Sequence, residues 1–179
     1  MIRLAVLLIA GCAAALQTGA MAMQPDHARR AAAILHNGQG RVVGDATAER
    51  EGGLVTVRLQ VRGFVPGTHG VHLHQTGRCE APAFASAGAH WNPASRQHGR
   101  LNPQGPHLGD LPNLQVEPGG AGRLAFAVPV PAGTPAGVNP LLDADGTAIV
   151  IHAAADDDRS DPAGNSGARI ACGVLAPLR

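Results

Sequence analysis

Two histidines separated by one residue, His72 and His74, are side chains whose type and spacing could do chemistry together. In an extended strand, side chains at positions i and i+2 point to the same face. A strand here would present two imidazoles on one side, while Val71 and Leu73 point the other way into a core. The spacing predicts a site that holds one metal ion, although a lone His-x-His pair is more typical of an ordinary strand surface.

Further residues of metal-binding type follow this pair along the chain. They are His90, His98, His107, Asp110 and, much later, His152. Imidazole nitrogen suits copper, zinc, iron and nickel, whereas Ca²⁺ and Mg²⁺ prefer sites made only of oxygen. Seven candidate ligands in one small chain therefore predict a transition-metal centre, and the rest of the chain is the scaffold that brings them together.

The candidate ligands divide into two groups by the elements that must position them. His72, His74 and His152 would come from rigid strands, and a rigid, nitrogen-rich set suits Cu(II). His98, His107 and Asp110 would come from a loop. They could close around zinc in a tetrahedral site if a third histidine joins them. His90 lies between the two groups in the sequence and could serve either.

The pattern of the remaining chain is that of short strands. Residues 54–61 alternate between apolar and polar side chains, which indicates a half-buried strand of an antiparallel sheet. Residues 75–113 show no convincing period, and such a long loop is expected only where it is functional or pinned. We expect an all-β fold, an antiparallel sandwich or flattened barrel of about eight strands with two long functional loops. The other expected strands are residues 31–36, 41–48, 69–74, 124–130, 148–152 and 168–175.

Composition limits the class of protein. The chain has 179 residues, enough for one domain with a real core. Its 24 glycines and 14 prolines disfavour long helices. A net charge of +1 and an aromatic content of 2% give no case for a nucleic-acid partner or for binding to an anionic membrane by bulk charge.

The N-terminus resembles an export signal rather than part of the fold. Arg3 precedes a short apolar run, and Ala20-Met21-Ala22 is a cleavage motif, which predicts a signal peptide over residues 1–22. Alternatively, residues 9–12 (IAGC) resemble the lipobox of bacterial lipoproteins, with residues 1–11 removed and Cys12 lipidated. We expect an exported protein in the bacterial periplasm, which contacts a membrane only if Cys12 carries a lipid.

Two cysteines, Cys79 and Cys172, lie within the expected domain. Export favours a disulfide between them, since extracytoplasmic compartments are oxidising. The alternative is a pair of free, buried thiols.

Four motifs resemble those of the copper/zinc superoxide dismutases. They are residues 67–74 (GTHGVHLH), 87–93 (AGAHWNP), 107–113 (HLGDLPN) and 164–173 (GNSGARIACG). The resemblance runs over residues 31–178, the expected domain, and implies a Greek-key arrangement of the strands. The short, lysine-free stretch 157–163 and the long gap from Cys79 to His90 resemble the bacterial exported branch of the family.

The resemblance also implies a role for each candidate. Copper, one per chain, would be held by His72, His74, His90 and His152; zinc, one per chain, by His90, His98, His107 and Asp110. His90 would bridge the two ions, and would take a proton on reduction and return it to the peroxide. Three residues that are not ligands also have implied roles. Asp156 would link His72 and His98, and His69 would support the fold through a hydrogen bond. Arg169 would attract the substrate at the mouth of the channel.

The function implied is the dismutation of superoxide to dioxygen and hydrogen peroxide. The alternative is a non-enzymatic periplasmic module that binds copper and zinc. An adhesion-type sandwich with incidental metal is a third, less favoured, possibility. We expect the chain to act as a monomer or a homodimer.

Overall fold

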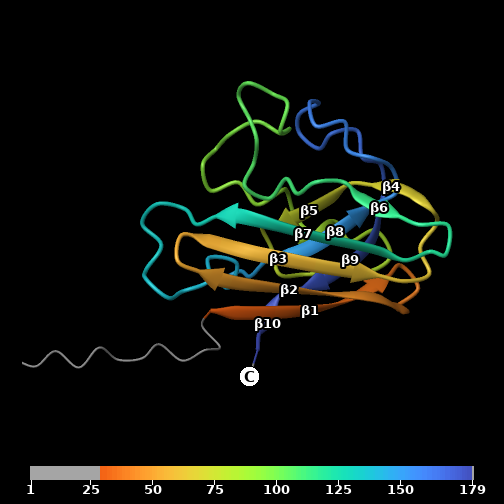
Figure 1. The fold of residues 1–179 in the computed structure, drawn as a ribbon, viewed down its shortest axis with the longest axis horizontal. Helices are drawn as coiled ribbons and strands as arrows, with labels where there is room; N and C mark the ends of the chain where they lie inside the picture. The colour runs from red at the N-terminus through yellow and green to blue at the C-terminus, as the bar shows by residue number, and fades with distance from the viewer. Residues whose placement is uncertain (1–28, 179) are drawn as a thin grey trace, which may run out of the picture.

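The computed structural model describes residues 29–178, and these residues form an all-β fold (Figure 1). The expected fold class is confirmed, although ten strands are present where about eight were predicted. The additional strands are short, because β4, β6 and β10 have two or three residues each. The strands are β1 (Arg30–Asn37), β2 (Val42–Glu51), β3 (Leu54–Val61), β4 (Gly67–His69), β5 (Val71–His74), β6 (Leu114–Val116), β7 (Gly122–Pro129), β8 (Ala148–His152), β9 (Arg169–Val174) and β10 (Ala176–Pro177).

One antiparallel sheet contains all of these strands, in the order β4-β6-β7-β3-β2-β1-β9-β8-β5, with β10 paired to β1. The two strands at the ends of this order, β4 and β5, are successive segments of the chain joined at Gly70. The sheet therefore curls into a nearly closed barrel, and β5 lies where the barrel nearly closes. This position leaves one edge of β5 free to pair with a loop.

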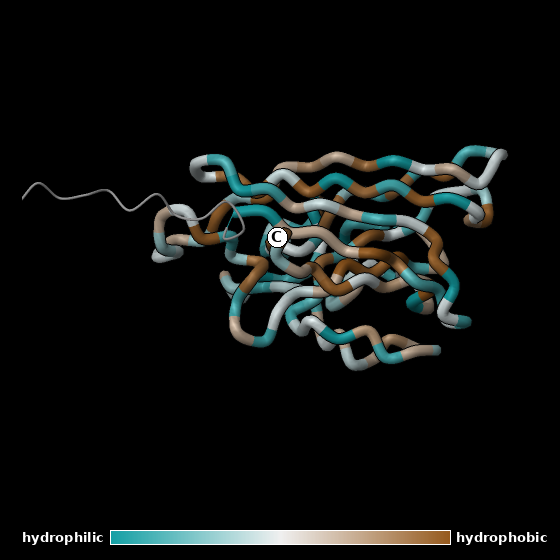
Figure 2. The backbone as a smooth tube through the Cα atoms, turned by 90° about the horizontal axis from the view of Figure 1, so that it is seen from below, coloured by the Kyte–Doolittle hydropathy of each residue, from teal (hydrophilic) through white to brown (hydrophobic). Residues whose placement is uncertain are grey.

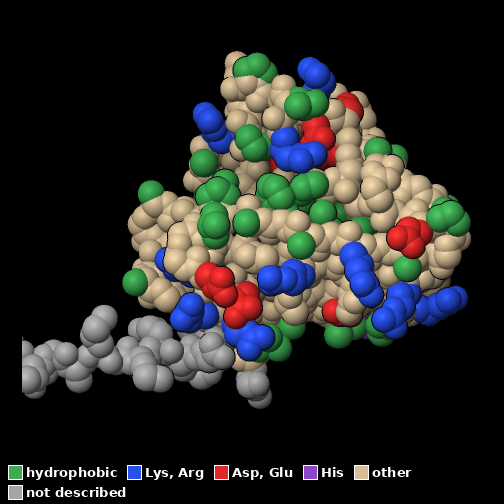
Figure 3. Space-filling model, viewed as in Figure 1, with side chains coloured by type: hydrophobic (Ala, Val, Ile, Leu, Met, Phe, Trp, Pro, Cys, Tyr) green, Lys and Arg blue, Asp and Glu red, His purple; other side chains and the backbone are tan. Residues whose placement is uncertain are grey.

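The core follows from the alternation along the strands. Val55, Val57, Leu59 and Val61 on β3 are all at most 3% exposed, while Arg58 between them is exposed. Figure 2 shows the same alternation of hydrophobic and hydrophilic residues along neighbouring strands. On the outer face of the sheet, arginines and carboxylates are interspersed, and no histidine of the described residues is visible there (Figure 3).

Two long loops connect the strands at residues 75–113 and 153–168. Part of the first loop and the second loop project together from one side of the barrel (Figure 1). The Leu101 amide donates to the Asp158 carbonyl at 2.9 Å. The Arg100 guanidinium also donates to both carboxylate oxygens of Asp158, at 2.8 and 2.7 Å. Asp158 is thus an ion-pair partner of Arg100. These contacts fasten the two loops to one another beside β5.

The predicted signal segment, including Cys12, lies outside the described residues. Within residues 29–178, no helix has the length and apolar character needed to cross a membrane.

Candidate metal centre

β5 and the loop beside it explain how residues far apart in sequence converge. His72 and His74 are fully buried, on the face of β5 opposite to Val71 and Leu73. β8 pairs with one edge of β5 and brings His152 close. Loop residues occupy the other edge, where His74 is opposite His90 and His72 is opposite Asp110. The loop approaches so closely that a Cβ on Gly109 would lie 2.5 Å from the Leu73 carbonyl oxygen.

The first set of converging groups contains only imidazoles. His72, His74, His90 and His152 each offer a ring nitrogen, and these four atoms all lie within 4.8 Å of one another. One nitrogen of each ring is buried and has no hydrogen-bond partner among the described residues. These atoms are His72 Nδ1, His74 Nε2, His90 Nε2 and His152 Nε2. Buried polar atoms are normally paired, so four orphaned nitrogens that converge fit a bound cation.

The opposite nitrogen of each ring is engaged, which fixes the tautomer. His72 Nε2–H donates to Asp156 Oδ2 at 2.6 Å. His74 Nδ1–H donates to the Gly88 carbonyl at 2.9 Å, and His152 Nδ1–H donates to the Gly167 carbonyl at 3.1 Å. Because the proton resides on the outer nitrogen, the inner nitrogen presents a lone pair to an ion.

The second set surrounds one carboxylate oxygen. Oδ1 of Asp110 lies 2.9 Å from His90 Nδ1, 3.0 Å from His98 Nδ1 and 3.2 Å from His107 Nδ1. The Nδ1 atoms of His90 and His107 are 3.4 Å apart. These separations are close to about 3.3 Å, the edge of a tetrahedron whose corners lie about 2.0–2.1 Å from a central zinc ion. The donors present therefore fit a tetrahedral site of three nitrogens and one oxygen.

His72 also belongs to a group of four with His90, His98 and Asp110 whose ligand atoms lie within 4.8 Å. Its Nε2 is occupied by Asp156, and its free Nδ1 belongs to the all-imidazole set. His107 is therefore the better fourth member of the second set. His90 is common to both sets, with Nε2 in the first and Nδ1 in the second.

Asp156 joins the two sets. Its Oδ2 accepts from His72, and its Oδ1 accepts from His98 Nε2–H at 3.0 Å. The loop packs tightly against this carboxylate, because a Cβ on Gly164 would overlap Asp156 Oδ1, and the φ of Gly164 is +63°. Only glycine fits such a contact at such a backbone angle.

The electrostatics of the two sets differ. Burial lowers the pKa of His72 to about 3, of His74 to about 2 and of His152 to about 4, so these rings are neutral at pH 7. Burial also acts to lower the pKa of His98, but the Asp110 and Asp156 carboxylates on either side outweigh it and raise that pKa to about 10. Hydrogen bonds from histidines hold the pKa of Asp110 and of Asp156 well below the usual range, despite their burial.

These shifts predict a bell-shaped stability profile for the metal-free protein. Below pH 6.5 the unfolded chain protonates His72, His74 and His152 while the folded chain does not, so the free energy of unfolding decreases as the pH falls from 6.5 towards 4. His98 acts in the opposite sense, because its stabilisation is complete below pH 6.5 and is lost as the pH rises towards 10.

Urea unfolding in the presence of a chelator, between pH 4.5 and 10, measures this profile. We expect the midpoint to be highest near neutral pH, and the alkaline decrease to be absent in a His98→Gln variant. A midpoint that keeps rising to pH 9 in the unmodified protein would show that His98 is neutral.

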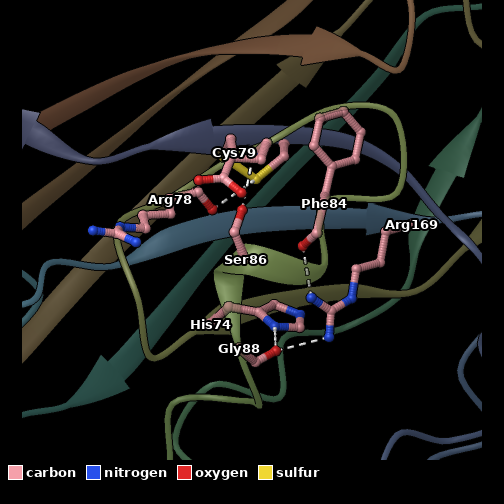
Figure 4. The surroundings of a disulfide bond; sticks show 9 residues. His74, Arg78, Cys79, Phe84, Ser86, Gly88 and Arg169 are labelled. Carbon is pink, nitrogen blue, oxygen red and sulfur yellow. Dashed lines mark hydrogen bonds between the residues drawn. A yellow bond between two sulfur atoms is a disulfide. The ribbon is translucent and has the colours of Figure 1, made fainter.

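The remaining candidates lie at the edge of the centre. Arg169 begins β9 and donates from Nη1 to the Phe84 carbonyl at 2.8 Å and from Nη2 to the Gly88 carbonyl at 2.7 Å (Figure 4). The expected disulfide between Cys79 and Cys172 is present, with Cα atoms 5.6 Å apart. The ring nitrogens of His69 lie 2.8 Å from the His152 carbonyl oxygen and 3.0 Å from that of Val65.

Two supporting residues were not predicted from the sequence. Asn113 exchanges two side-chain hydrogen bonds of 2.8 Å with the backbone of Asp156. Asp161 accepts from the His98 amide at 2.5 Å. Asn113 lies within a motif that resembles the family, but neither residue type nor spacing indicates such a contact across 43 residues.

Comparison with known proteins agrees with this centre. The family model for copper/zinc superoxide dismutase (SODC) matches residues 39–175. The chain belongs to the copper/zinc superoxide dismutase family. It is 42% identical over 147 residues to "Superoxide dismutase [Cu-Zn] 2" of Aquifex aeolicus, covering 82% of this chain and 86% of that protein. It is also 42% identical over 147 residues to "Superoxide dismutase [Cu-Zn]" of Caulobacter vibrioides, covering 81% and 84%.

A solved structure shows the same fold. The crystal structure of a SOD-like protein from Bacillus subtilis superimposes with a TM-score of 0.73 at 38% identity, covering 80% of this chain and 97% of that one. The expected family and fold class are therefore confirmed.

Proposed function

We propose that this chain disproportionates superoxide into dioxygen and hydrogen peroxide, with copper in the all-imidazole set and zinc in the set around Asp110. The observation that carries the proposal is the convergence of four buried, unpartnered imidazole nitrogens, of which one belongs to a histidine shared with a second, tetrahedral set. The copper ligands are His72, His74, His90 and His152; the zinc ligands are His90, His98, His107 and Asp110.

The donor atoms support this division of the metals. Four nitrogens on or beside rigid strands suit Cu(II), while three nitrogens and one oxygen at tetrahedral separations suit zinc. Copper, when bound, supplies the one-electron chemistry that the reaction needs, because one superoxide must lose an electron and the next must gain one.

The chain's own residues position the ions and the proton. His90 Nε2 can hold a proton between the two half-reactions and release it to the peroxide, while its Nδ1 stays on the zinc side. Asp156 accepts the Nε2–H of both His72 and His98, so that Nδ1 is the atom of each ring that faces a bound ion.

Superoxide dismutation by the chain that begins at Met23 tests the proposal directly. Protein loaded with copper and zinc is compared with protein loaded with zinc alone. We expect activity that depends on copper and is inhibited by cyanide. Full occupancy of both metals without activity would favour the alternative, a periplasmic copper- and zinc-binding module.

Arg169 is proposed to attract superoxide at the channel mouth. It is partly buried, and no carboxylate among residues 29–178 forms an ion pair with it, so its charge is not neutralised locally. We expect Arg169→Ala to lower kcat/KM by about ten-fold at low ionic strength and to weaken its salt dependence. Arg58→Ala removes the same charge from an exposed position on β3 and serves as the control. An Arg169→Ala rate equal to that of the unmodified protein at low salt would contradict this role.

Export and anchoring complete the proposal. We infer that residues 1–22 direct the chain to the bacterial periplasm, or that residues 1–11 are removed and Cys12 is lipidated. The mass of the mature protein separates the two outcomes, since only the second retains Cys12 with attached acyl chains. The domain of residues 31–178 acts as a monomer or a homodimer, which sedimentation distinguishes.

A further inference from the structure

Two backbone carbonyls of one short loop segment hold the Arg169 guanidinium. Nη1 donates to Phe84 and Nη2 to Gly88, at 2.8 and 2.7 Å (Figure 4). The Gly88 carbonyl also accepts the Nδ1–H of His74 at 2.9 Å. The orientation of Arg169 relative to His74 therefore depends on where the segment from Phe84 to Gly88 places its carbonyl groups.

The backbone of Phe84 has an unusual conformation. Its φ is 54° and its ψ is 26°, the left-handed region, which bulky side chains rarely adopt. A glycine would adopt this conformation without strain, so the contribution of phenylalanine is its ring and not backbone freedom. Phe84 directly precedes a short 3-10 turn, η2 (Ala85–Ala87), and supplies no side-chain cap to it.

The ring of Phe84 is buried in a small apolar cluster separate from the main core. Phe84 is 1% exposed, and the buried members of the cluster besides it are Ala87, Ala148, Val150 and Cys172. This cluster contains residues of β8 and β9, the strands that carry His152 and Arg169. The ring thus anchors the loop to the two strands whose side chains face the centre.

Burial of the ring and the direction of the carbonyl are consequently linked. The Phe84 amide donates to the Glu80 carbonyl at 2.9 Å, and the Phe84 carbonyl accepts from the Ala87 amide at 3.2 Å as well as from Arg169. With both backbone groups fixed and the ring held, the carbonyl oxygen has one direction, towards the Arg169 guanidinium.

We propose that Phe84 is a positioning residue for Arg169: its buried ring holds the left-handed backbone whose carbonyl fixes the guanidinium beside His74. The inference rests on the proposed role of Arg169 in attracting superoxide. It assigns a functional reason to an aromatic side chain that is not one of the candidate metal ligands.

The direct test is the reactivity of Arg169 itself. The copper- and zinc-loaded protein is treated with phenylglyoxal, and the modification of Arg169 is followed by mass spectrometry. Loss of one hydrogen bond to the guanidinium is expected to speed modification about two- to ten-fold in Phe84→Ala. Phe84→Leu keeps most of the apolar volume, so its rate of Arg169 modification is expected to lie between those of the unmodified protein and Phe84→Ala. It also supplies the measurement if Phe84→Ala does not fold.

A matched control separates positioning from general destabilisation. Leu141→Ala removes a fully buried side chain from the main core, away from this cluster. It is expected to lower the stability without changing the modification rate of Arg169. An equal increase in that rate in Leu141→Ala and Phe84→Ala would overturn the inference.

A double-mutant cycle then ties the effect to superoxide attraction. We expect Phe84→Ala to lower kcat/KM at low salt and to weaken azide binding to the copper site, and to have no further effect in the Arg169→Ala background. If Phe84→Ala remains fully effective in that background, Phe84 does not act through Arg169. If Arg169→Ala alone changes nothing, the proposed role of Arg169 fails, and the phenylglyoxal result still decides whether Phe84 positions it.

Discussion

Replacement of Asp156 by asparagine is expected to lower the affinity for zinc by about 10–100-fold. The carboxylate accepts an N–H from His72 on one oxygen and from His98 on the other, at 2.6 and 3.0 Å. Asparagine has one acceptor and one donor in the same place. Its NH₂ group would face an imidazole N–H, so one histidine must move its proton to Nδ1, the atom that faces the metal.

The same change should disturb copper as well, since His72 belongs to the all-imidazole set. Competition with a chromophoric chelator measures each affinity separately. Asp157→Asn is the matched control, because this neighbouring carboxylate is exposed and contacts only the backbone and side chains of its own loop, at Arg159, Ser160 and Asn165. Equal zinc affinities in the two variants would show that Asp156 does not orient His98.

The sequence predicts the parts of this protein that depend on local pattern. Alternation predicts β3 over residues 54–61 without error, because one face of the strand is buried and the other is solvated. The pair His72 and His74 is predicted to share a face of a strand, and both are buried on the side away from Leu73. The residue types predict a transition-metal centre, and the strands and the loop that carry them predict two groups of ligands. The assignment of His90 to both groups comes from the family resemblance.

The parts that the sequence does not predict depend on contacts between distant backbone segments. The pairing of the 89–91 and 109–111 segments with β5 sets His90 opposite His74, and no local pattern encodes this register. The ion pair of Arg100 with Asp158 spans 58 residues. Arg169 is held by the backbone carbonyls of Phe84 and Gly88. Because every residue has a backbone carbonyl, the residue types at these positions do not predict the contact.

Removal of the disulfide by a Cys79→Ala, Cys172→Ala double variant is expected to lower the free energy of unfolding by about 2–5 kcal/mol. The bond links residues 93 positions apart, and closure of so long a loop constrains the unfolded chain strongly. Cys172 is also fully buried in the cluster around Phe84, so the cross-link and the ring fasten the same loop to β9. The variant should therefore also speed the modification of Arg169, whose donors lie on β9 and whose acceptors lie on that loop.

Urea unfolding of the metal-free protein, with and without a reducing agent, measures the stability change. The reduced unmodified protein should unfold close to the double variant, and the reducing agent should have no effect on the double variant itself. Metal-free conditions are required, because bound metal stabilises the folded state by mass action and would mask the change. A double variant as stable as the oxidised protein would mean that packing within the cluster, and not the covalent bond, holds the loop. In that case, adding Phe84→Leu to the double variant would lower the free energy of unfolding more than removal of the disulfide does.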